Sequence, residues 1–298
     1  MPTQNNRRPT PAPQKVLVKI AATTLNPLDW KIQAYGLYVQ SYPHIAGCEA
    51  AGTVEEVGSE VQNLAKGDRI LFQGDFANTH ATFQQYCVVP ADRTSKCSHI
   101  PDNISFDQAA SVPLGLATVA TGLWSLHPDA RSVKWPALWE QECATKFAGK
   151  PALILGGSSS VGQYAIQLAK LSGHSPIITT ASPHNAALLK SLGATHVVDR
   201  SLAPADVLCE IQKIAGGMPI EYVYDTISST DTQVLAYDAL APGGTLLLTQ
   251  TAATPDDKAK DGDGKRVVFV FGSAHAPFNR ALGLELCSRV RSREGSYM

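Results

Sequence analysis

Residues 153–162 read LILGGSSSVG, a short apolar run followed by glycines and serines, and the helix-forming stretch QYAIQLAK follows directly. Glycines let the chain turn tightly, and the N-terminus of the helix presents free N–H groups to an anion such as a pyrophosphate. Ser159 occupies the middle glycine of the G-x-G-x-x-G pattern, so the alternative is a loop that only connects two elements. We predict a phosphate-binding turn made by Gly156, Gly157, Ser158, Ser159, Ser160, Val161 and Gly162.

A strand–helix alternation starts at this turn and continues to about residue 271. Helical stretches at 163–171 and 185–192 separate apolar runs that have the length of buried strands. The pattern predicts an α/β fold with a doubly wound parallel sheet in the Rossmann order. The predicted strands are 152–155, 176–180, 196–199, 222–225, 245–249 and 267–271, with a polar, flexible loop at 252–266 before the last.

The N-terminal part of the chain has a different texture. Residues 15–20 alternate polar and apolar side chains, and further short strands separated by Gly, Pro and Asp are predicted at 50–57, 69–72 and 86–89. This is typical of a compact all-β barrel. Around it we expect a loose arm at 1–14, a helix capped by Ser105, a second helix at 113–124, and an insertion or loop at 127–150.

Composition describes an ordinary globular protein, with 44% hydrophobic and 17% charged residues and a net charge of −1. Such a charge does not draw the chain to nucleic acid or to an anionic membrane. No apolar run reaches the ~20 residues that span a bilayer, and the N-terminus lacks the apolar region of a secretory signal. The six cysteines form no C-x-x-C pair, which favours free thiols in a cytoplasmic protein over a disulfide framework or structural zinc.

The second strand of the alternation is followed by TTASPHN at 179–185, a stretch without an acidic residue. An NAD-specific fold usually places Asp or Glu about 20 residues after the glycines, to hold the ribose hydroxyls. Small hydroxylated residues leave room for a 2′-phosphate, although Ser182-Pro183 can also simply cap the next helix. We therefore predict NADPH as the cofactor, with contacts from Ser182, Pro183, His184 and Asn185 and a positive charge from Arg200.

The stretch GCEAAGTVEEVGSEV at 47–61 resembles the G-H-E-x-x-G-x-x-x-x-x-G-x-x-V signature of medium-chain alcohol dehydrogenases. Flanked by NPLDWK at 26–31 and KGDRI at 66–70, it resembles most closely the zinc-free, trans-acting enoyl reductases that serve fungal polyketide synthases. The resemblance implies a partial GroES-like β-barrel domain at 1–112, which would be the catalytic domain, a Rossmann domain at 113–275, and a truncated C-terminal segment at 276–298.

Two substitutions bear on the metal. Cys48 replaces the zinc-binding histidine of the signature, and no cysteine ligand is present near residues 26–29, whereas catalytic zinc needs three protein ligands. We expect no metal and interpret Cys48 as a small buried residue. The chemistry implied is hydride transfer from NADPH to an activated C=C, in an enoyl thioester of a polyketide intermediate or in a related enone or quinone. The substrate would be a small molecule or a carrier-bound acyl chain, supplied by a polyketide synthase; the alternative is a non-redox binding protein or cyclase.

The resemblance also implies site residues, each with a plainer alternative. Lys31 would bind phosphate or polarise the substrate, or be a solvated lysine; Thr118 would position nicotinamide and substrate, or only pack its helix. Tyr35 and Tyr38 are conceivable proton donors or ordinary surface tyrosines, and Asp225 is a candidate loop cap. The implied catalytic residues are Thr118 and Lys31, and the remaining implied cofactor contacts are Leu28, Asp29, Trp30, Lys31, Leu248, Phe271, Gly272 and Ser273.

The chain is short at both ends compared with this family, whose members begin with an extra β-hairpin and end with elements that return to the catalytic domain. Three explanations stay open: a pared-down enzyme with a more open cleft, a truncated product with poor activity, or a fold diverted to a non-redox role. An exposed barrel edge would invite pairing with another chain, so either a monomer or a homodimer is expected.

Overall fold

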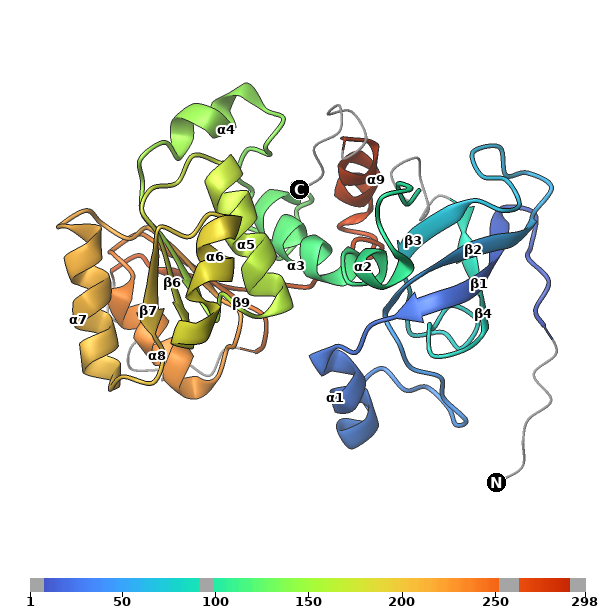
Figure 1. Cartoon of the computed structure of the whole chain (residues 1–298), viewed down its shortest axis with the longest axis horizontal. Coiled ribbons are helices and arrows are strands. Elements are labelled where there is room, and N and C mark those ends of the chain that lie inside the picture. The colour runs from blue at the N-terminus through green and yellow to red at the C-terminus, as the bar shows by residue number, and fades with distance from the viewer. Residues whose placement is uncertain (1–7, 92–98, 252–262, 290–298) are drawn as a thin grey trace. The chain divides into compact units, whose positions relative to one another are not determined.

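The computed structural model describes residues 8–91, 99–251 and 263–289 (Figure 1). The chain forms two compact units: unit 1 consists of residues 1–114 and 273–298, and unit 2 of residues 115–272. None of the helices in the described ranges is long and apolar enough to cross a bilayer.

Unit 2 is built on a parallel six-stranded sheet with the strand order β10-β9-β8-β5-β6-β7. The chain builds one half of the sheet outward from β5 and then returns to place β8 on its other side, so the strand order reverses between β5 and β8. This is the predicted Rossmann order, and the α/β fold class is confirmed. The strands are β5 (Ala152–Leu155), β6 (Ile177–Ala181), β7 (His196–Asp199), β8 (Tyr222–Asp225), β9 (Thr245–Leu248) and β10 (Arg266–Phe269).

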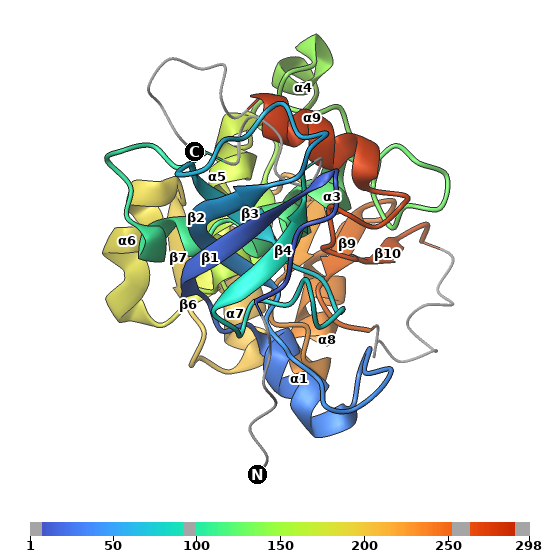
Figure 2. The same ribbon diagram turned by 90° about the vertical axis from the view of Figure 1, so that its right-hand side faces the viewer.

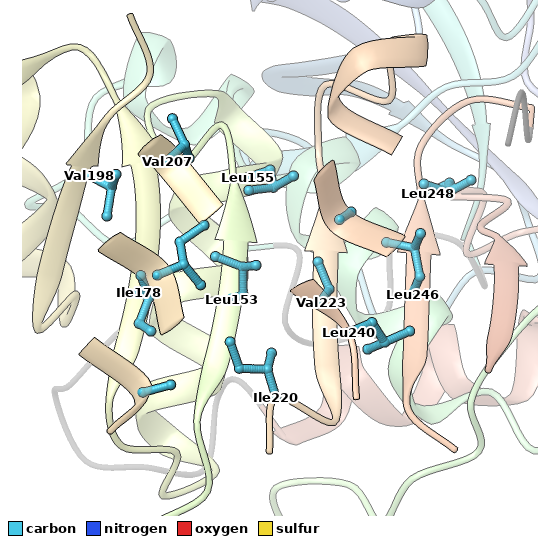
Figure 3. Close-up of a cluster of buried hydrophobic side chains, with 13 residues drawn as sticks. Leu153, Leu155, Ile178, Val198, Val207, Ile220, Val223, Leu240, Leu246 and Leu248 are labelled. Carbon is cyan, nitrogen blue, oxygen red and sulfur yellow. The ribbon is translucent and has the colours of Figure 1, made fainter. Parts of the chain in front are cut away.

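Helices cover both faces of this sheet (Figure 1). Val207 and Ile211 of α7 and Ala236 of α8 pack on a fully buried aliphatic face that includes Leu153 and Leu246 (Figure 3). A Cβ on Gly122 of α3 would lie 3.0 Å or less from Leu247 and Val270, so the glycine lets this helix approach the opposite face closely. The helices are α3 (Pro113–Trp124), α4 (Gln141–Lys146), α5 (Ser160–Leu171), α6 (Ala186–Leu192), α7 (Pro204–Ala215), α8 (Thr230–Ala239) and the short 3₁₀ turn η2 (Pro183–Asn185).

The stretch predicted as an insertion or loop at 127–150 is loop and turn apart from the short helix α4 (Gln141–Lys146), and it packs against the body of unit 2. Trp135 packs tilted against Phe147 and edge-on against Tyr222, with ring centroids 4.6 and 4.9 Å apart. The His174 ring stacks on both, with its centroid 5.0 Å from that of Phe147 and 5.4 Å from that of Tyr222. Aromatic packing therefore holds this irregular connection in place.

Unit 1 contains a four-stranded antiparallel sheet with the order β3-β2-β1-β4 (Figure 2). Alternate residues of these strands, including Val16, Val18 and Phe72, form one buried cluster. The alternation read from the sequence therefore identified the strands correctly, to within three residues at each end. They are β1 (Lys15–Thr23), β2 (Glu49–Val57), β3 (Arg69–Gln73) and β4 (Tyr86–Pro90).

Three helices accompany this sheet. Helix α2 (Phe106–Ala110) begins with the predicted cap, in which the Ser105 hydroxyl accepts a hydrogen bond from the Gln108 amide at 3.2 Å. Helix α1 (Pro27–Tyr35) was not predicted, and α9 (Arg280–Arg289) belongs to the C-terminal part of unit 1. The segment before α9 is held to β3, because the Ala274 amide donates to Gln73 Oε1 at 3.0 Å.

Residues 8–14 differ from the loose arm that we expected, while residues 1–7 lie outside the described ranges. Arg8 pairs with Glu56 at 2.9 Å and lies over the Tyr86 ring, and Gln14 donates to Glu60 at 2.7 Å. These contacts hold the segment against the sheet of unit 1. The predicted flexible loop at 252–266 falls largely on residues 252–262, which are likewise not described.

We predict that unit 2 loses stability in mild acid because of His174. Burial lowers the pKa of this imidazole to about 4, whereas in the unfolded chain it is about 6.5. The unfolded state therefore binds a proton that the folded state excludes, so this contribution is complete above about pH 6.5 and falls by about 2–3 kcal/mol as the pH approaches 4. Urea unfolding of wild type and His174→Phe at several pH values measures it. Identical pH dependence of the two proteins would contradict the assignment.

Candidate functional site

The turn between β5 and α5 is shaped by three glycines that no other residue could replace without displacement. Gly156 has φ +78, and a Cβ there would overlap with Ile227. A Cβ on Gly157 would collide with the Thr179 hydroxyl, and one on Gly162 with the carbonyl of Gly156. The three glycines therefore let the turn pack closely against the loop after β8, against β6 and against the first turn of α5. The first N–H groups of α5 lie directly after this turn, at the place where anion-binding turns present theirs.

Ser159 stands where the pattern has its middle glycine, and its backbone explains why a serine is accepted. Its φ of −67 and ψ of 160 are ordinary extended values, so no glycine is needed. Its hydroxyl accepts a hydrogen bond from the Gly162 amide at 3.0 Å and thereby caps α5. The flanking Ser158 and Ser160 are exposed, so their hydroxyls are available to a ligand at this helix end.

The region after β6 brings two predicted residues together. The Arg200 Nε donates to Ser182 Oγ at 2.9 Å, although the two residues are 18 positions apart. Pro183 begins η2, but the Ser182 side chain makes no capping hydrogen bond, so a capping role is not what holds it. His184 is exposed and Asn185 half-buried in the same turn. A polar, cationic surface thus follows β6 where NAD-specific folds carry an acid.

The loop after β8 belongs to the same edge of the sheet, and only one of its residues was considered from the sequence. Asp225 is fully buried, and its Oδ1 accepts hydrogen bonds from the amides of Ile227 at 3.0 Å and Ser228 at 2.8 Å. Burial raises the pKa of this carboxyl. Its interpretation as a loop cap is confirmed. Thr226 and Ile227, which contact the glycine turn, had no periodic signal that could have identified them.

Thr118 lies on α3 beside the end of the last strand. A Cβ on Gly272 would overlap with the Thr118 hydroxyl, so the two residues pack directly, and the Thr118 carbonyl accepts a hydrogen bond from the Tyr224 hydroxyl at 3.2 Å. Phe271 belongs to this group through its carbonyl, which accepts from the Thr121 hydroxyl at 3.3 Å. Leu248 differs, because its side chain is fully buried in the core and only its backbone could face a ligand.

The remaining predicted residues lie in unit 1. Leu28, Asp29, Trp30 and Lys31 occupy the first turn of α1, and Ser273 accepts a hydrogen bond at its carbonyl from Asn279 at 3.0 Å. Asp29 is buried, and its Oδ2 accepts from the Asn26 amide at 2.7 Å, so this carboxylate caps the helix. Desolvation lowers the pKa of Lys31, whose ammonium lies 5.6 Å from the centre of the Trp30 ring.

The two tyrosines weighed as proton donors are largely exposed. Tyr35 is 67% exposed at the end of α1, and Tyr38 is 47% exposed and stacks on Phe76 at a centroid distance of 4.2 Å. No residue in the described part of unit 1 buries or orients either hydroxyl in the way that a proton donor would require.

Cys48 is buried beside Asp29, and its thiol donates to Asp29 Oδ1 at 3.7 Å. Burial and the neighbouring carboxylates raise the pKa of this thiol to about 12, so it stays protonated at neutral pH. The interpretation as a small buried residue is confirmed. Within the described ranges, no three His, Cys, Asp or Glu side chains gather closely enough to hold a metal ion.

Glu49, the next residue of the signature, has a structural role that we did not anticipate. Its Oε1 accepts from the Thr24 hydroxyl at 2.5 Å and from Asn26 Nδ2 at 2.9 Å, and its Oε2 accepts from the Leu114 amide at 2.7 Å. Within unit 1, one buried carboxylate thus ties β2 to the segment after β1 and to Leu114. Burial raises its pKa in spite of these hydrogen bonds.

Comparison with known proteins accounts for both units. Residues 12–102 match the alcohol dehydrogenase GroES-like domain, and residues 160–283 match the family described as zinc-binding dehydrogenase. The trans-enoyl reductase TOXD of Cochliobolus carbonum is 37% identical over 221 residues, covering 72% of this chain and 67% of that protein. The trans-enoyl reductase TwmE of Talaromyces wortmannii is 33% identical, covering 96% of this chain and 77% of that protein.

The chain belongs to the medium-chain dehydrogenase/reductase superfamily. The predicted resemblance to fungal trans-enoyl reductases is confirmed at the level of sequence. Solved structures of the superfamily agree: an alcohol dehydrogenase superfamily protein from Novosphingobium aromaticivorans has a TM-score of 0.75 and 27% identity, covering 95% of this chain and 78% of that chain. The quinone oxidoreductase of Pseudomonas syringae also has a TM-score of 0.75, with 25% identity over 95% of this chain and 80% of that chain.

This superfamily member is shorter than several of its relatives. The match to the trans-enoyl reductase himH of Aspergillus japonicus covers 65% of that protein, and the match to dehydrogenase pigH of Monascus ruber covers 52%. The chain therefore spans between half and two thirds of the length of these relatives.

The cap on α5 predicts a difference between neighbouring serines. Ser159→Ala removes the hydroxyl that accepts from the Gly162 amide, and we expect it to lower the free energy of unfolding by about 1 kcal/mol. Ser158→Ala, whose side chain is exposed, is the matched control and should change it by less than about 0.5 kcal/mol. Urea unfolding measures both. Equal stability of the two variants would show that Ser159 is not the cap.

Proposed function

We propose that this protein is an NADPH-dependent reductase that delivers hydride to an activated C=C. The observation that carries the proposal is the glycine turn at the start of α5. At each of its three glycines a Cβ would collide with neighbouring atoms, so the tight turn requires glycine. The trans-enoyl reductase names of relatives at 33–37% identity support the reaction class.

The residues at this edge of unit 2 fit a nicotinamide dinucleotide. The first N–H groups of α5 and the hydroxyls of Ser158 and Ser160 would hold the pyrophosphate. Ser182 and Arg200, already joined at 2.9 Å, would hold the 2′-phosphate, since the exposed guanidinium keeps further N–H donors for its oxygens. His184 and Asn185 add polar groups beside them. This donor set is the reason to favour NADPH over NADH.

When bound, the cofactor supplies the hydride. Thr118 is the residue of unit 2 that we propose to orient the nicotinamide ring, because its half-buried hydroxyl packs against Gly272 and its carbonyl is fixed by Tyr224. Lys31 is proposed to bind the substrate oxygen: its pKa is already lowered by desolvation, and an ammonium beside a carbonyl oxygen stabilises developing negative charge there.

We propose an enoyl thioester carried by a polyketide synthase as the substrate, on the strength of the relatives' names, with a free enone or quinone as the second substrate class. The quinone oxidoreductase likeness favours that second class. Either substrate offers a carbonyl conjugated to the C=C, which is what the proposed roles of Lys31 and Thr118 require. Whether the protein works as a monomer or a homodimer stays a prediction.

The test is calorimetric titration of the purified protein with NADPH and with NADH, before and after Arg200→Ala. We expect micromolar NADPH binding and a clear preference over NADH. The variant should weaken NADPH binding by about tenfold or more and leave the Kd for NADH within about twofold of wild type, because a charge-assisted hydrogen bond to the 2′-phosphate is lost. Arg266→Ala, an exposed arginine at the start of β10, is the matched control.

Equal losses of both nucleotides in Arg200→Ala would remove this residue from the 2′-phosphate site. With NADPH bound, turnover is then measured as the loss of reduced nicotinamide absorbance on addition of enoyl thioesters and of quinones. A wild-type protein that binds neither nucleotide would contradict the reductase proposal and favour a non-redox role.

A further inference from the structure

Two hydroxyls that are far apart in the sequence meet behind the phosphate turn. Thr226 follows β8 and Ser159 lies in the turn after β5, 67 positions away, and their side-chain oxygens are 2.8 Å apart. Thr226 Oγ1 also contacts the turn itself, since a Cβ on Gly156 would lie only 2.8 Å from it. β5 and β8 are the neighbouring strands at which the strand order reverses.

The protons of this pair can be placed from their surroundings. Thr226 Oγ1 lies 2.8 Å from the Leu155 carbonyl and 3.0 Å from the Gly156 carbonyl, and a carbonyl can only accept. If Thr226 gives its proton to a carbonyl, its oxygen is free to accept the proton of Ser159. Ser159 in turn accepts from the Gly162 amide at 3.0 Å. This arrangement uses both hydroxyl protons and leaves none unpaired in a half-buried place.

We propose that Thr226 is a positioning residue for the cofactor's pyrophosphate, which rests on the function proposed above. By accepting the Ser159 proton it turns a lone pair of Ser159 toward the Gly162 amide, and so holds the turn and the first turn of α5 in one arrangement. Ser159 is then a structural cap and not a phosphate ligand. The hydroxyls left for the pyrophosphate are those of Ser158 and Ser160, which are exposed on either side of it.

This assignment separates the three consecutive serines by chemistry. The outer two have exposed side chains that can rotate to meet an anion. The Ser159 hydroxyl instead donates its proton to Thr226 and accepts a hydrogen bond from the Gly162 amide, so it has no proton left for a phosphate oxygen. A turn that is already ordered before binding loses less conformational entropy when the nucleotide arrives. Thr226 would therefore raise affinity without touching the nucleotide.

The test compares Thr226→Val, which keeps the shape and removes the hydroxyl, with Thr226→Ser, which keeps the hydroxyl. We expect Thr226→Val to weaken the binding of NADPH and of NADH alike, by about five- to tenfold in Kd. Thr226→Ser should bind both nucleotides within about twofold of the wild-type Kd. Thr195→Val removes a hydroxyl of the same kind at the opposite edge of the sheet, where it bonds the backbone of Ile177, and should leave binding unchanged.

Hydrogen exchange of the protein without nucleotide gives a second readout. The Gly162 amide should exchange faster in Thr226→Val than in wild type. In Thr226→Ser and in Thr195→Val it should exchange at the wild-type rate. Thr226 acts through Ser159, so Thr226→Val should add little in a Ser159→Ala background, for exchange and for affinity. If Thr226→Val destabilises the fold, Thr226→Ala is used in its place. Alanine avoids placing a methyl group against the two carbonyls.

The outcomes are distinguishable. Unchanged Gly162 exchange in Thr226→Val, or additive losses in the double variant, would overturn the positioning role even if NADPH binds. An equal loss of nucleotide affinity in Thr226→Val and Thr226→Ser would show that the hydroxyl is not the cause, and it would overturn the positioning role as well. A wild-type protein that binds no nucleotide would instead contradict the proposed function, while the exchange experiment would still decide whether Thr226 orders the turn.

Discussion

The close approach of α5 to the end of β5 is the constraint on which the architecture of unit 2 depends. Gly162 lies so near the Gly156 carbonyl that any side chain at this position would push the helix away from the sheet. The approach places the N-terminus of α5 at the carboxyl edge of the sheet, where the strand order reverses. In open α/β sheets this is where ligands bind. One pair of glycines thus sets the packing of this helix and the position of its N-terminus, where we place the candidate site.

The polar groups at this edge are largely satisfied by one another. The Asp225 carboxylate holds the loop after β8, the Thr249 amide donates to the Ser228 hydroxyl at 2.9 Å, and Gln233 Nε2 donates to the Ser228 carbonyl at 2.9 Å. Buried polar groups are costly unless they are paired, so these contacts fix the loops after β8 and β9. The serine side chains of the turn and the Ser182–Arg200 pair remain exposed at the same edge, which is where we place the phosphates.

Much of unit 2 could be predicted because its strands are short apolar runs bounded by turn residues. The bounds of β5, β7 and β8 agree with the prediction residue for residue, and α3 was likewise correct at both ends. Helix α1 was missed because its nine residues lack an apolar stripe, although Asn26-Pro27 with Asp29 is a recognisable start signal. The segment around Trp135 is irregular, as its prolines indicated, but its aromatic packing could not be predicted because the partner Tyr222 is distant in the sequence.

The candidate site likewise has features that the sequence revealed and features that only the structure shows. The glycine turn and the missing acid after β6 were visible in the sequence, because each depends on residues close together in the chain. The contacts of Thr226 with Ser159, and of Glu49 with Leu114, join residues 67 and 65 positions apart, and no local pattern encodes them. Asp29 shows the converse: it stood in a segment implied to contact the cofactor, but its carboxylate is taken up by the helix cap and Cys48.

A crystal structure of the protein grown with NADPH tests the central claim most directly. The account predicts pyrophosphate oxygens about 3 Å from the first backbone N–H groups of α5 and from the hydroxyls of Ser158 and Ser160. It also predicts that Ser159 still bonds Thr226 and Gly162, with the 2′-phosphate beside Arg200. A nucleotide whose pyrophosphate lies away from this turn, or is held by the Ser159 hydroxyl, would contradict the account.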